Sequence, residues 1–238
     1  MTTLILLPGL ACNAVMWQHQ LAALPAALNT QVTDVHTRFD KVQAMAQALL
    51  NEHPGYLILC GASMGGMLAM EVARQAPARI KALALLGTNA RPETPEMRKL
   101  REAAILFFEQ GRAEEVLKFN LGMAFHKSRI NDTALTQTYL DFVLAAGAAQ
   151  LVRQNRAVMA RPDARLHLPQ INCPTLVLCG DGDQLTPPEC SREIASLVPA
   201  AEIQFVADCG HMLTMERPTE VNAVLLPWLD RTLARINA

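Results

Sequence analysis

Residues 57–66 read Leu57-Ile58-Leu59-Cys60-Gly61-Ala62-Ser63-Met64-Gly65-Gly66. An apolar run typical of a buried strand enters the pattern G-x-S-x-G and continues into a helix-forming segment. Small residues around the serine allow strand and helix to approach closely, so the pattern predicts a nucleophile elbow that exposes the Ser63 hydroxyl. The helix N-terminus behind Ser63 would favour a developing anion. Because ordinary glycine-rich turns can also match the pattern, its meaning depends on the rest of the chain.

The composition of the chain is that of a globular protein. Of its 238 residues, 51% are hydrophobic and 18% are charged, and the formal net charge is −1. This length suits one domain with an insertion or two modest domains. The charge gives no reason to expect a nucleic acid or an anionic membrane surface as a partner. The sequence contains no pattern from which we predict an oligomeric state.

The cysteines and the N-terminus favour a cytoplasmic protein. The chain has six cysteines, at positions 12, 60, 173, 179, 190 and 209, and none forms a C-x-x-C pair. This scatter favours a reducing compartment over a disulfide framework. The N-terminal run has no basic residues and stops at Pro8. We therefore read it as a buried strand rather than a signal peptide, and we expect no membrane span.

Short apolar runs alternate with helix-forming segments along much of the chain. The predicted strands are 3–7, 31–36, 56–60, 82–86, 175–179 and 202–206, and the predicted helices between the first four are 15–27, 41–52 and 64–76. This alternation indicates a parallel sheet with helices on both faces. Reactive groups of such sheets lie beyond the carboxyl ends of the strands, where we place Leu10, Ser63, Asp183 and His211.

The alternation stops between residues 91 and 160. We expect a helix from Thr94 to about Gln110 and further helices over 112–124 and 132–160, with a break near Gly147. We interpret 91–160 as a helical cap over the serine, and 1–90 with 161–238 as the core. Apolar residues at helical spacing should mostly form contacts between helices, while a few line a pocket.

A nucleophilic serine needs a base, and the base needs an acid to orient it. Among six histidines, His211 follows a predicted strand, whereas the others lack a motif and are more often surface or loop residues; these are His19, His36, His53, His126 and His167. The acid should come from the loop after strand 175–179, where Asp181 and Asp183 compete. A calcium loop is the weaker reading of these aspartates, because no bidentate glutamate follows at the needed spacing.

The oxyanion of acyl transfer also needs hydrogen-bond donors. We expect one donor to be the backbone N–H of Met64, the residue after the nucleophile. The other should lie in the loop after the first strand, where the backbone N–H of Leu10 is the best candidate. The chain order of serine, acid and histidine is the order of the α/β-hydrolase triad.

The chain resembles the α/β-hydrolase superfamily over nearly its full length. The motifs that carry the resemblance are Leu7-Pro8-Gly9-Leu10 with Trp17, residues 61–66, residues 173–180, Gly180-Asp181-Gly182-Asp183 with Pro187, and Gly210-His211 with Glu216 and Pro218. In the family pattern the acid is the aspartate three residues after the strand-end glycine, so the resemblance selects Asp183 over Asp181. The resemblance thus implies a triad of Ser63, Asp183 and His211.

The resemblance also implies the details of the fold. Many relatives carry His-Gly where this chain has Pro8-Gly9, so we expect any role of that histidine to be missing. The chain starts at what resembles the third strand of the family, so we expect the usual leading hairpin to be missing. We expect an α/β-hydrolase fold with a mostly parallel sheet of about six strands, flanked by helices and carrying a helical cap.

Within the superfamily the chain is most similar to small-cap serine esterases and enol-lactone hydrolases. We expect a carboxylesterase of the EC 3.1.1 type that cleaves a small ester through an acyl-enzyme. The alternatives are hydrolysis of a lactone or a carbon–carbon bond, or a lyase reaction, on the same triad. A non-catalytic ligand-binding homologue is a third alternative, which the complete triad disfavours. We expect a small-molecule ester or lactone as the substrate, and no metal or organic cofactor.

Trp17, Met212 and Phe142 are the residues we expect to line an apolar substrate pocket. We expect Met67 and Met70 to be core residues rather than pocket residues. Arg153, Arg156 and Arg161 could bind a substrate carboxylate, although a solvated position is the commoner role for each.

Overall fold

The computed structural model describes residues 2–199 and 201–237, and in these residues the centre of the molecule is one parallel sheet. The order of its six strands is β2-β1-β3-β4-β5-β6, and every neighbouring pair is parallel. The strands are β1 (Thr2–Leu7), β2 (Thr30–Val32), β3 (Tyr56–Ala62), β4 (Ile80–Leu86), β5 (Thr175–Gly180) and β6 (Glu202–Val206). Because the strands are parallel, all their carboxyl ends lie at one edge. The predicted fold class is confirmed.

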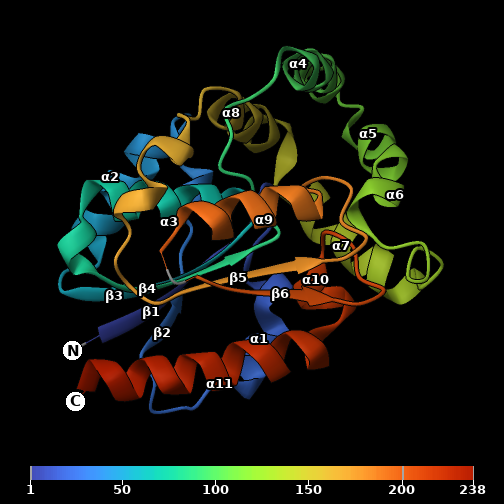
Figure 1. Ribbon diagram of the computed structural model, residues 1–238. Helices are drawn as coiled ribbons and strands as arrows, with labels where there is room; N and C mark the ends of the chain where they lie inside the picture. The colour runs from blue at the N-terminus through green and yellow to red at the C-terminus, as the bar shows by residue number, and fades with distance from the viewer. Residues whose placement is uncertain (1, 200, 238) are drawn as a thin grey trace.

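Helices cover both faces of the sheet (Figure 1). One face carries α1 (Gln18–Ala23) and α11 (Pro218–Asn237), and the other carries α2 (Val42–Glu52), α3 (Met64–Gln75) and α9 (Pro188–Leu197). Alternate strand residues therefore enter two apolar clusters. Leu4 and Leu6 of β1 pack in one cluster, and Ile5 and Leu7 pack in the other. Burial on both faces explains why these strands are continuous apolar runs.

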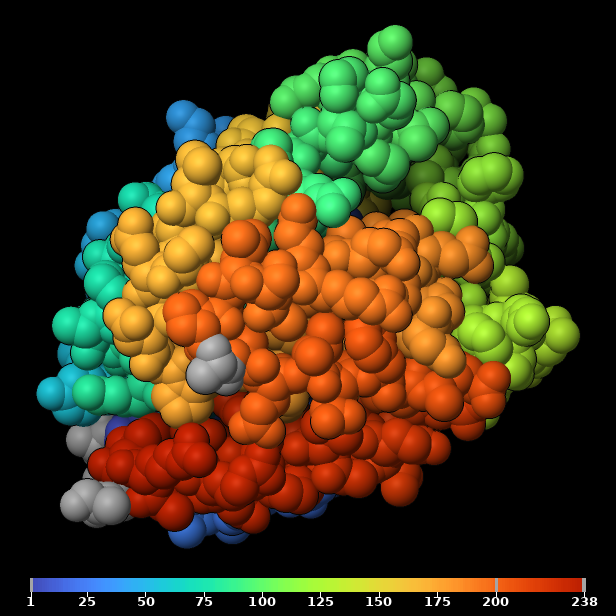
Figure 2. All heavy atoms as spheres, in the orientation of Figure 1, coloured from blue at the N-terminus to red at the C-terminus, as the bar shows by residue number. Residues whose placement is uncertain are grey.

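Helices α4–α8, which we call the cap helices, connect β4 to β5. They are α4 (Pro95–Glu109), α5 (Ala113–Phe119), α6 (Leu121–Ala124), α7 (Thr133–Ala145) and α8 (Gly147–Met159). Thr94 and Asp132 cap α4 and α7, since their side chains accept backbone N–H groups three residues later. Ala146 separates α7 from α8, and α8 begins at Gly147, which has a φ of 75°. In Figure 2 the green residues of α4 to α6 form a raised block beside the core.

Short helical turns complete the fold. They are η1 (Ala14–Trp17), η2 (Val35–Thr37), η3 (Pro77–Arg79), η4 (Ala164–Leu166), η5 (Leu168–Gln170) and α10 (Leu213–Glu216). None of the helices in the described residues is both long enough and apolar enough to cross a membrane.

Three local predictions were wrong. The strand predicted over 31–36 ends at Val32, because its pairing with β1 ends at the pair of Leu6 and Val32. The chain then turns into η2. The helix predicted over 15–27 is divided into η1 and α1. It ends before Pro25, because a proline disfavours the helical conformation in the residue that precedes it. The helix predicted over 112–124 is interrupted at Asn120, between α5 and α6.

Candidate active site

Ser63 lies on the turn between β3 and α3 in a strained backbone conformation. Its φ is 54° and its ψ is −117°, a region that residues with a side chain rarely adopt. The backbone around it is fixed on both sides. Ser63 N donates to Leu86 O at 2.9 Å, and Thr88 Oγ1 donates to Ser63 O at 2.7 Å. The turn therefore has the geometry predicted for a nucleophile elbow.

Two glycines allow the close approach that this turn needs. A Cβ on Gly61 would overlap the backbone of Gly65, and a Cβ on Gly65 would overlap the carbonyl of Leu7. Strand β3, helix α3 and the end of β1 therefore meet at distances that only glycine permits.

His211 and Asp183 form a buried pair at the carboxyl ends of β6 and β5. His211 Nδ1 lies 2.8 Å from Asp183 Oδ2, and the two side chains are 8% and 0% exposed. Asp183 Oδ1 also accepts the backbone N–H groups of Leu185 and Thr186, and Oδ2 accepts the Thr186 hydroxyl at 2.7 Å. These contacts satisfy both carboxylate oxygens, so the carboxylate is held in one orientation.

Burial and mutual attraction shift the pKa values of the pair in opposite directions. Burial alone would lower the pKa of His211, but the charge of Asp183 and its hydrogen bond outweigh burial and raise this pKa above its ordinary value. Burial alone would raise the pKa of Asp183, but His211 and the Thr186 hydrogen bonds outweigh it and lower this pKa. The pair thus favours a carboxylate beside a basic imidazole.

Asp181 has a different partner. Its Oδ1 accepts the backbone N–H of Cys209 at 3.3 Å. The structure therefore distinguishes the two candidate aspartates. Asp183 contacts His211, whereas Asp181 supports the loop that precedes His211.

The end of β4 joins the serine to the acid–histidine pair. Leu86 O binds the backbone of Ser63, and a Cβ on the next residue, Gly87, would lie 3.2 Å from Asp183 Oδ2. No hydrogen bond connects the Ser63 hydroxyl to His211, both of which are described residues. Such contacts are often long before substrate binds and shorten in the substrate complex.

The loop after β1 borders Ser63. A Cβ on Gly9 would lie 3.4 Å from Ser63 Cβ, and Cys12 N donates to Gly9 O at 3.1 Å across the turn. Within the described residues, the N–H of Leu10 donates to no other group. Met64 is the first residue of α3, so its N–H belongs to the first turn, which lacks intrahelical acceptors. Neither N–H donates to a group in the described residues, and their role as oxyanion donors stays a prediction.

Glu216 holds the loop of His211 to the cap. Its carboxylate accepts N–H groups from Gly210 and Met212 in that loop, and from His126 after α6, at 2.8–3.1 Å. The backbone N–H groups of His211 and Met212 both donate to Ala124 O, at 3.0 and 3.1 Å. The cap segment 124–126 thus fixes the backbone that carries the imidazole.

The three residues predicted to line the pocket are all buried in one apolar cluster. Trp17 is 0%, Met212 4% and Phe142 5% exposed. Phe142 stacks edge-on against Tyr139 with ring centroids 5.5 Å apart, and Tyr139 does the same with Phe125 at 5.2 Å. This aromatic row connects α7 to the segment that holds the His211 loop. Met67 and Met70 are core residues, as predicted, and the core they belong to lies on the opposite face of the sheet.

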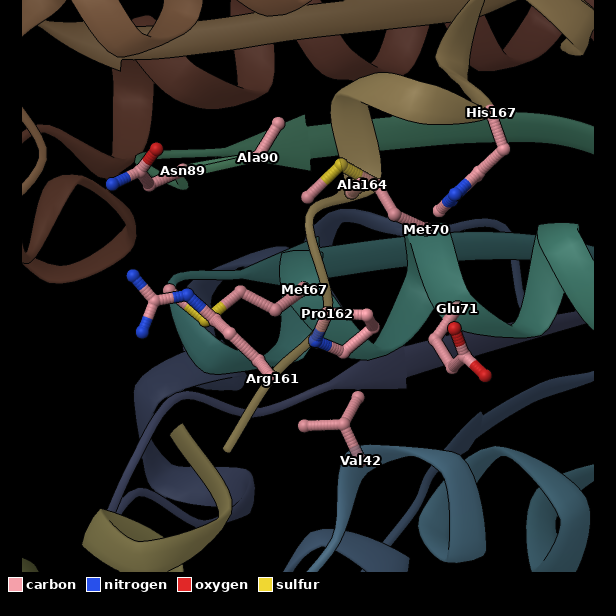
Figure 3. A pocket seen from close by; sticks show the side chains of 10 residues that line it. All are labelled: Val42, Met67, Met70, Glu71, Asn89, Ala90, Arg161, Pro162, Ala164 and His167. Atoms are coloured by element: carbon pink, nitrogen blue, oxygen red, sulfur yellow. The ribbon is translucent and has the colours of Figure 1, made fainter. Parts of the chain in front are cut away.

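Two cavities lie near these elements. One of about 310 Å³ lies beside the loop after β1 and is lined by residues that include Ala11, Cys12, His36 and Phe142. The other lies between α2, α3 and the chain after α8 (Figure 3). Its volume of about 10 Å³ accommodates no more than one water molecule, so it is too small for an ester.

Two expectations for charged residues need correction. His36 is 1% exposed rather than a surface residue, because η2 turns its ring inward, where Nε2 lies 2.9 Å from Cys12 O. Arg161 is also buried and binds Glu93 at 2.9 Å, and Arg101 of α4 binds the same carboxylate at 2.7 Å. Arg156 is exposed, as expected, and Arg153 donates to Thr37 O at 2.8 Å.

Sequence reasoning missed the supporting groups of the site. Thr186 gave no signal beyond its position three residues after Asp183. The buried polar residues of α8 did give a sequence signal, since Gln154 and Asn155 share a helical face with the apolar Leu151 and Val158. A polar side chain on an apolar face must find a buried partner, and this requirement could have identified both.

The model of the Hydrolase_4 family, described as serine aminopeptidase, S33, matches residues 25–218. A pimeloyl-[acyl-carrier protein] methyl ester esterase from Aromatoleum aromaticum is 27% identical over 94% of this chain and 96% of its own length.

Two solved structures are similar over nearly the whole chain. A thermophilic esterase from Thermogutta terrifontis, with malate bound, has a TM-score of 0.88 and 26% identity, over 98% of this chain and 90% of its own. The enol-lactonase from Burkholderia xenovorans LB400 has a TM-score of 0.86 and 22% identity, over 97% and 92%.

Proposed function

We propose that this chain, which belongs to the Hydrolase_4 (serine aminopeptidase, S33) family of the α/β-hydrolase superfamily, is a carboxylesterase of the EC 3.1.1 type. It cleaves a small carboxylic ester through an acyl-enzyme, with Ser63 as nucleophile, His211 as base and Asp183 as the acid that orients the base. The backbone N–H groups of Leu10 and Met64 form the oxyanion hole. The hydrolase class itself follows from the family; the ester and the residue roles are our proposal.

In this mechanism Ser63 Oγ attacks the ester carbonyl while His211 Nε2 takes the hydroxyl proton. The tetrahedral oxyanion accepts hydrogen bonds from Leu10 N–H and Met64 N–H. His211 then delivers the proton to the leaving alkoxide, and the acyl group stays on Ser63. A water molecule, deprotonated by His211, attacks the acyl-enzyme and releases the acid. Asp183 remains ionised throughout and stabilises the imidazolium.

One observation carries the proposal. A buried aspartate–histidine pair with 2.8 Å between Nδ1 and Oδ2 lies at the same sheet edge as a serine held at a φ of 54°. A strained serine is retained where its exposure serves a reaction. The pKa of His211, raised by Asp183, suits a general base.

Two of the relatives support an ester as the substrate. The Aromatoleum protein and the Thermogutta protein, at 27% and 26% identity, are both named as esterases. The enol-lactonase, at 22% identity, supports the fold alone. Of the three predicted pocket residues, Phe142 lines the cavity of about 310 Å³ and would contact the acyl or alcohol group. Trp17 and Met212 are buried in the same apolar cluster and would support that wall from behind it.

The division of the chain follows from this proposal. Residues 1–90 and 161–238 form the core that carries the triad, and residues 91–160 form the cap that covers it. We also propose a cytoplasmic location, because the six cysteines, all in the described residues, are free.

The test is hydrolysis of p-nitrophenyl esters of increasing acyl length, together with a lactone panel, by wild type and Ser63→Ala. We expect wild type to prefer short esters and Ser63→Ala to lose turnover. Ser196→Ala, which removes a hydroxyl that bonds only its own helix, is the matched control and should keep wild-type rates. Unchanged ester turnover in Ser63→Ala would exclude the mechanism, and a preference for lactones would replace the ester assignment.

A further inference from the structure

The loop after β1 contains a second strained residue close to the catalytic serine. Ala11 has a φ of 59°, in the left-handed region that residues with a side chain rarely adopt. It belongs to the turn closed by Cys12 N and Gly9 O, and it is 1% exposed. The turn places two successive N–H groups, those of Leu10 and Ala11, in different surroundings. Of these two, the Ala11 N–H donates to a side chain, whereas the Leu10 N–H donates to no group among the described residues.

The Ala11 N–H is held by a side chain from the cap. Gln154 of α8 accepts it with Oε1 at 2.8 Å, although 143 residues separate the two in sequence. The side-chain nitrogen of Gln154 donates to His36 O at 3.0 Å. Only one orientation of the amide satisfies both contacts, since an N–H faces its oxygen and a carbonyl faces its nitrogen. Gln154 is 0% exposed, so no water competes for either group.

His36 closes this arrangement into a ring. Its Nε2 lies 2.9 Å from Cys12 O, which can only accept, so Nε2 carries the proton. Burial lowers the pKa of His36, more than the hydrogen bond to Cys12 raises it, which favours the neutral ring. Two backbone groups of the loop, Ala11 N and Cys12 O, are thus bound through Gln154 and His36. The hydrogen-bonded ring ties α8, η2 and the loop together.

We propose that Gln154 is a positioning residue for the oxyanion hole. By occupying the Ala11 N–H it holds the turn in its strained conformation and leaves the Leu10 N–H as the donor beside Ser63. This inference rests on the proposed function, because an oxyanion hole matters only if Ser63 performs acyl transfer. It also gives the cap a direct part in the reaction through α8.

Gln154 would make the same contacts if it only stabilised the packing of the cap on the core. The test must therefore distinguish an effect on the oxyanion hole from an effect on stability. Gln154→Met keeps the size of the side chain and removes both hydrogen bonds. We expect kcat for p-nitrophenyl acetate to fall by about 10–100-fold, less than the roughly 10²–10³-fold cost of removing an oxyanion donor, because the substitution displaces the Leu10 N–H without removing it. KM should change by less than about threefold, because the loss falls on the transition state. Gln137→Met, an exposed glutamine of α7, should match wild type.

The affinities of two inhibitors provide a readout that a purely stabilising role of Gln154 would not change. A trifluoromethyl ketone forms a tetrahedral adduct with the serine and places an oxyanion in the hole, whereas a neutral product alcohol binds without an anionic oxygen. Gln154→Met should weaken the ketone by the same factor as kcat/KM and leave binding of the alcohol unchanged. Equal weakening of both ligands, or an unchanged kcat, would overturn the proposal.

A measurement on the wild-type protein keeps the proposal testable if Gln154→Met does not fold. In NMR spectra of isotope-labelled wild type, the ketone adduct should move the amide protons of Leu10 and Met64 downfield and leave that of Ala11 in place. A shift of Ala11 without Leu10 would refute the assigned role. If the ketone forms no adduct and Ser63→Ala remains active, the proposed function itself fails, and this inference fails with it.

Discussion

His211 Nδ1 lies 2.8 Å from Asp183 Oδ2, and the two residues come from the ends of adjacent strands. The contact raises the pKa of the imidazole above its ordinary value of about 6.5. A general base must be neutral, so activity should rise with pH as His211 loses its proton. We expect kcat/KM to reach half its plateau above pH 6.5. A profile of kcat/KM against pH with a midpoint at or below that value would contradict the pairing.

Asp183→Asn should change both the rate and this profile. The amide removes the negative charge, so the midpoint should move down, and it allows the wrong tautomer of His211, so kcat should fall by about 10³–10⁴-fold. The same pH series on the variant provides the measurement. Asp181→Asn is the matched control, because Asp181 contacts Cys209 N instead of the imidazole. An equal loss in both variants would refute the choice of Asp183.

Glu216→Gln should weaken the support of the loop that carries His211. The carboxylate serves three backbone N–H groups, from Gly210, Met212 and His126, and an amide can accept with one oxygen only. We expect a loss of about 2 kcal/mol in the free energy of unfolding. The His211 loop should shift as well, lowering kcat by about 10–100-fold. Urea unfolding and steady-state kinetics measure the two effects, with the exposed Glu220→Gln as control.

Gly65→Ala tests the close packing of the elbow. The new methyl would overlap the Leu7 carbonyl, and neither backbone can move without displacing Ser63 or the loop after β1. We predict a destabilisation of at least about 3 kcal/mol, seen in thermal or urea unfolding. In Gly122→Ala the nearest atom, Ile130 Cδ1, lies 3.8 Å from the new Cβ, so stability should change by less than about 1 kcal/mol. Similar stability of the two variants would show that the packing argument is wrong.

Glu93→Gln tests the attachment of the cap. The Glu93 side chain is 4% exposed, and its Oε2 binds both Arg101 and Arg161, at 2.7 and 2.9 Å. Without this carboxylate two guanidinium groups face each other in a largely buried cluster, and we expect a loss of about 3 kcal/mol. Glu202→Gln removes one partner of the exposed Arg231 pair and should cost less than about 1 kcal/mol. Unfolding in urea distinguishes these results.

Most of the fold could be predicted because its strands are buried on both faces. The apolar runs at β1, β3, β4 and β5 are direct consequences of that burial. Strand β2 was harder, since it is an edge strand whose length depends on where β1 stops. Val35 and His36 look strand-like in sequence, yet they lie in η2 beyond the last residue of the ladder.

The site shows the same division between local and long-range information. Ser63, His211 and the two candidate aspartates follow strands and could be located from sequence, whereas a choice between Asp181 and Asp183 needed a resemblance or the structure. The contact of Gln154 with Ala11 crosses 143 residues and depends on how the cap packs on the core. No local pattern encodes that distance.

The central claim is that Ser63 carries the acyl group during turnover. We propose to quench the reaction with p-nitrophenyl acetate in acid at early times, digest the protein and measure peptide masses. The account predicts one acetyl group on the peptide that contains Ser63 in wild type, and none in Ser63→Ala. Steady hydrolysis of the ester by Ser63→Ala, or an acetyl group found on another residue that forms and decays at the rate of turnover, would contradict it.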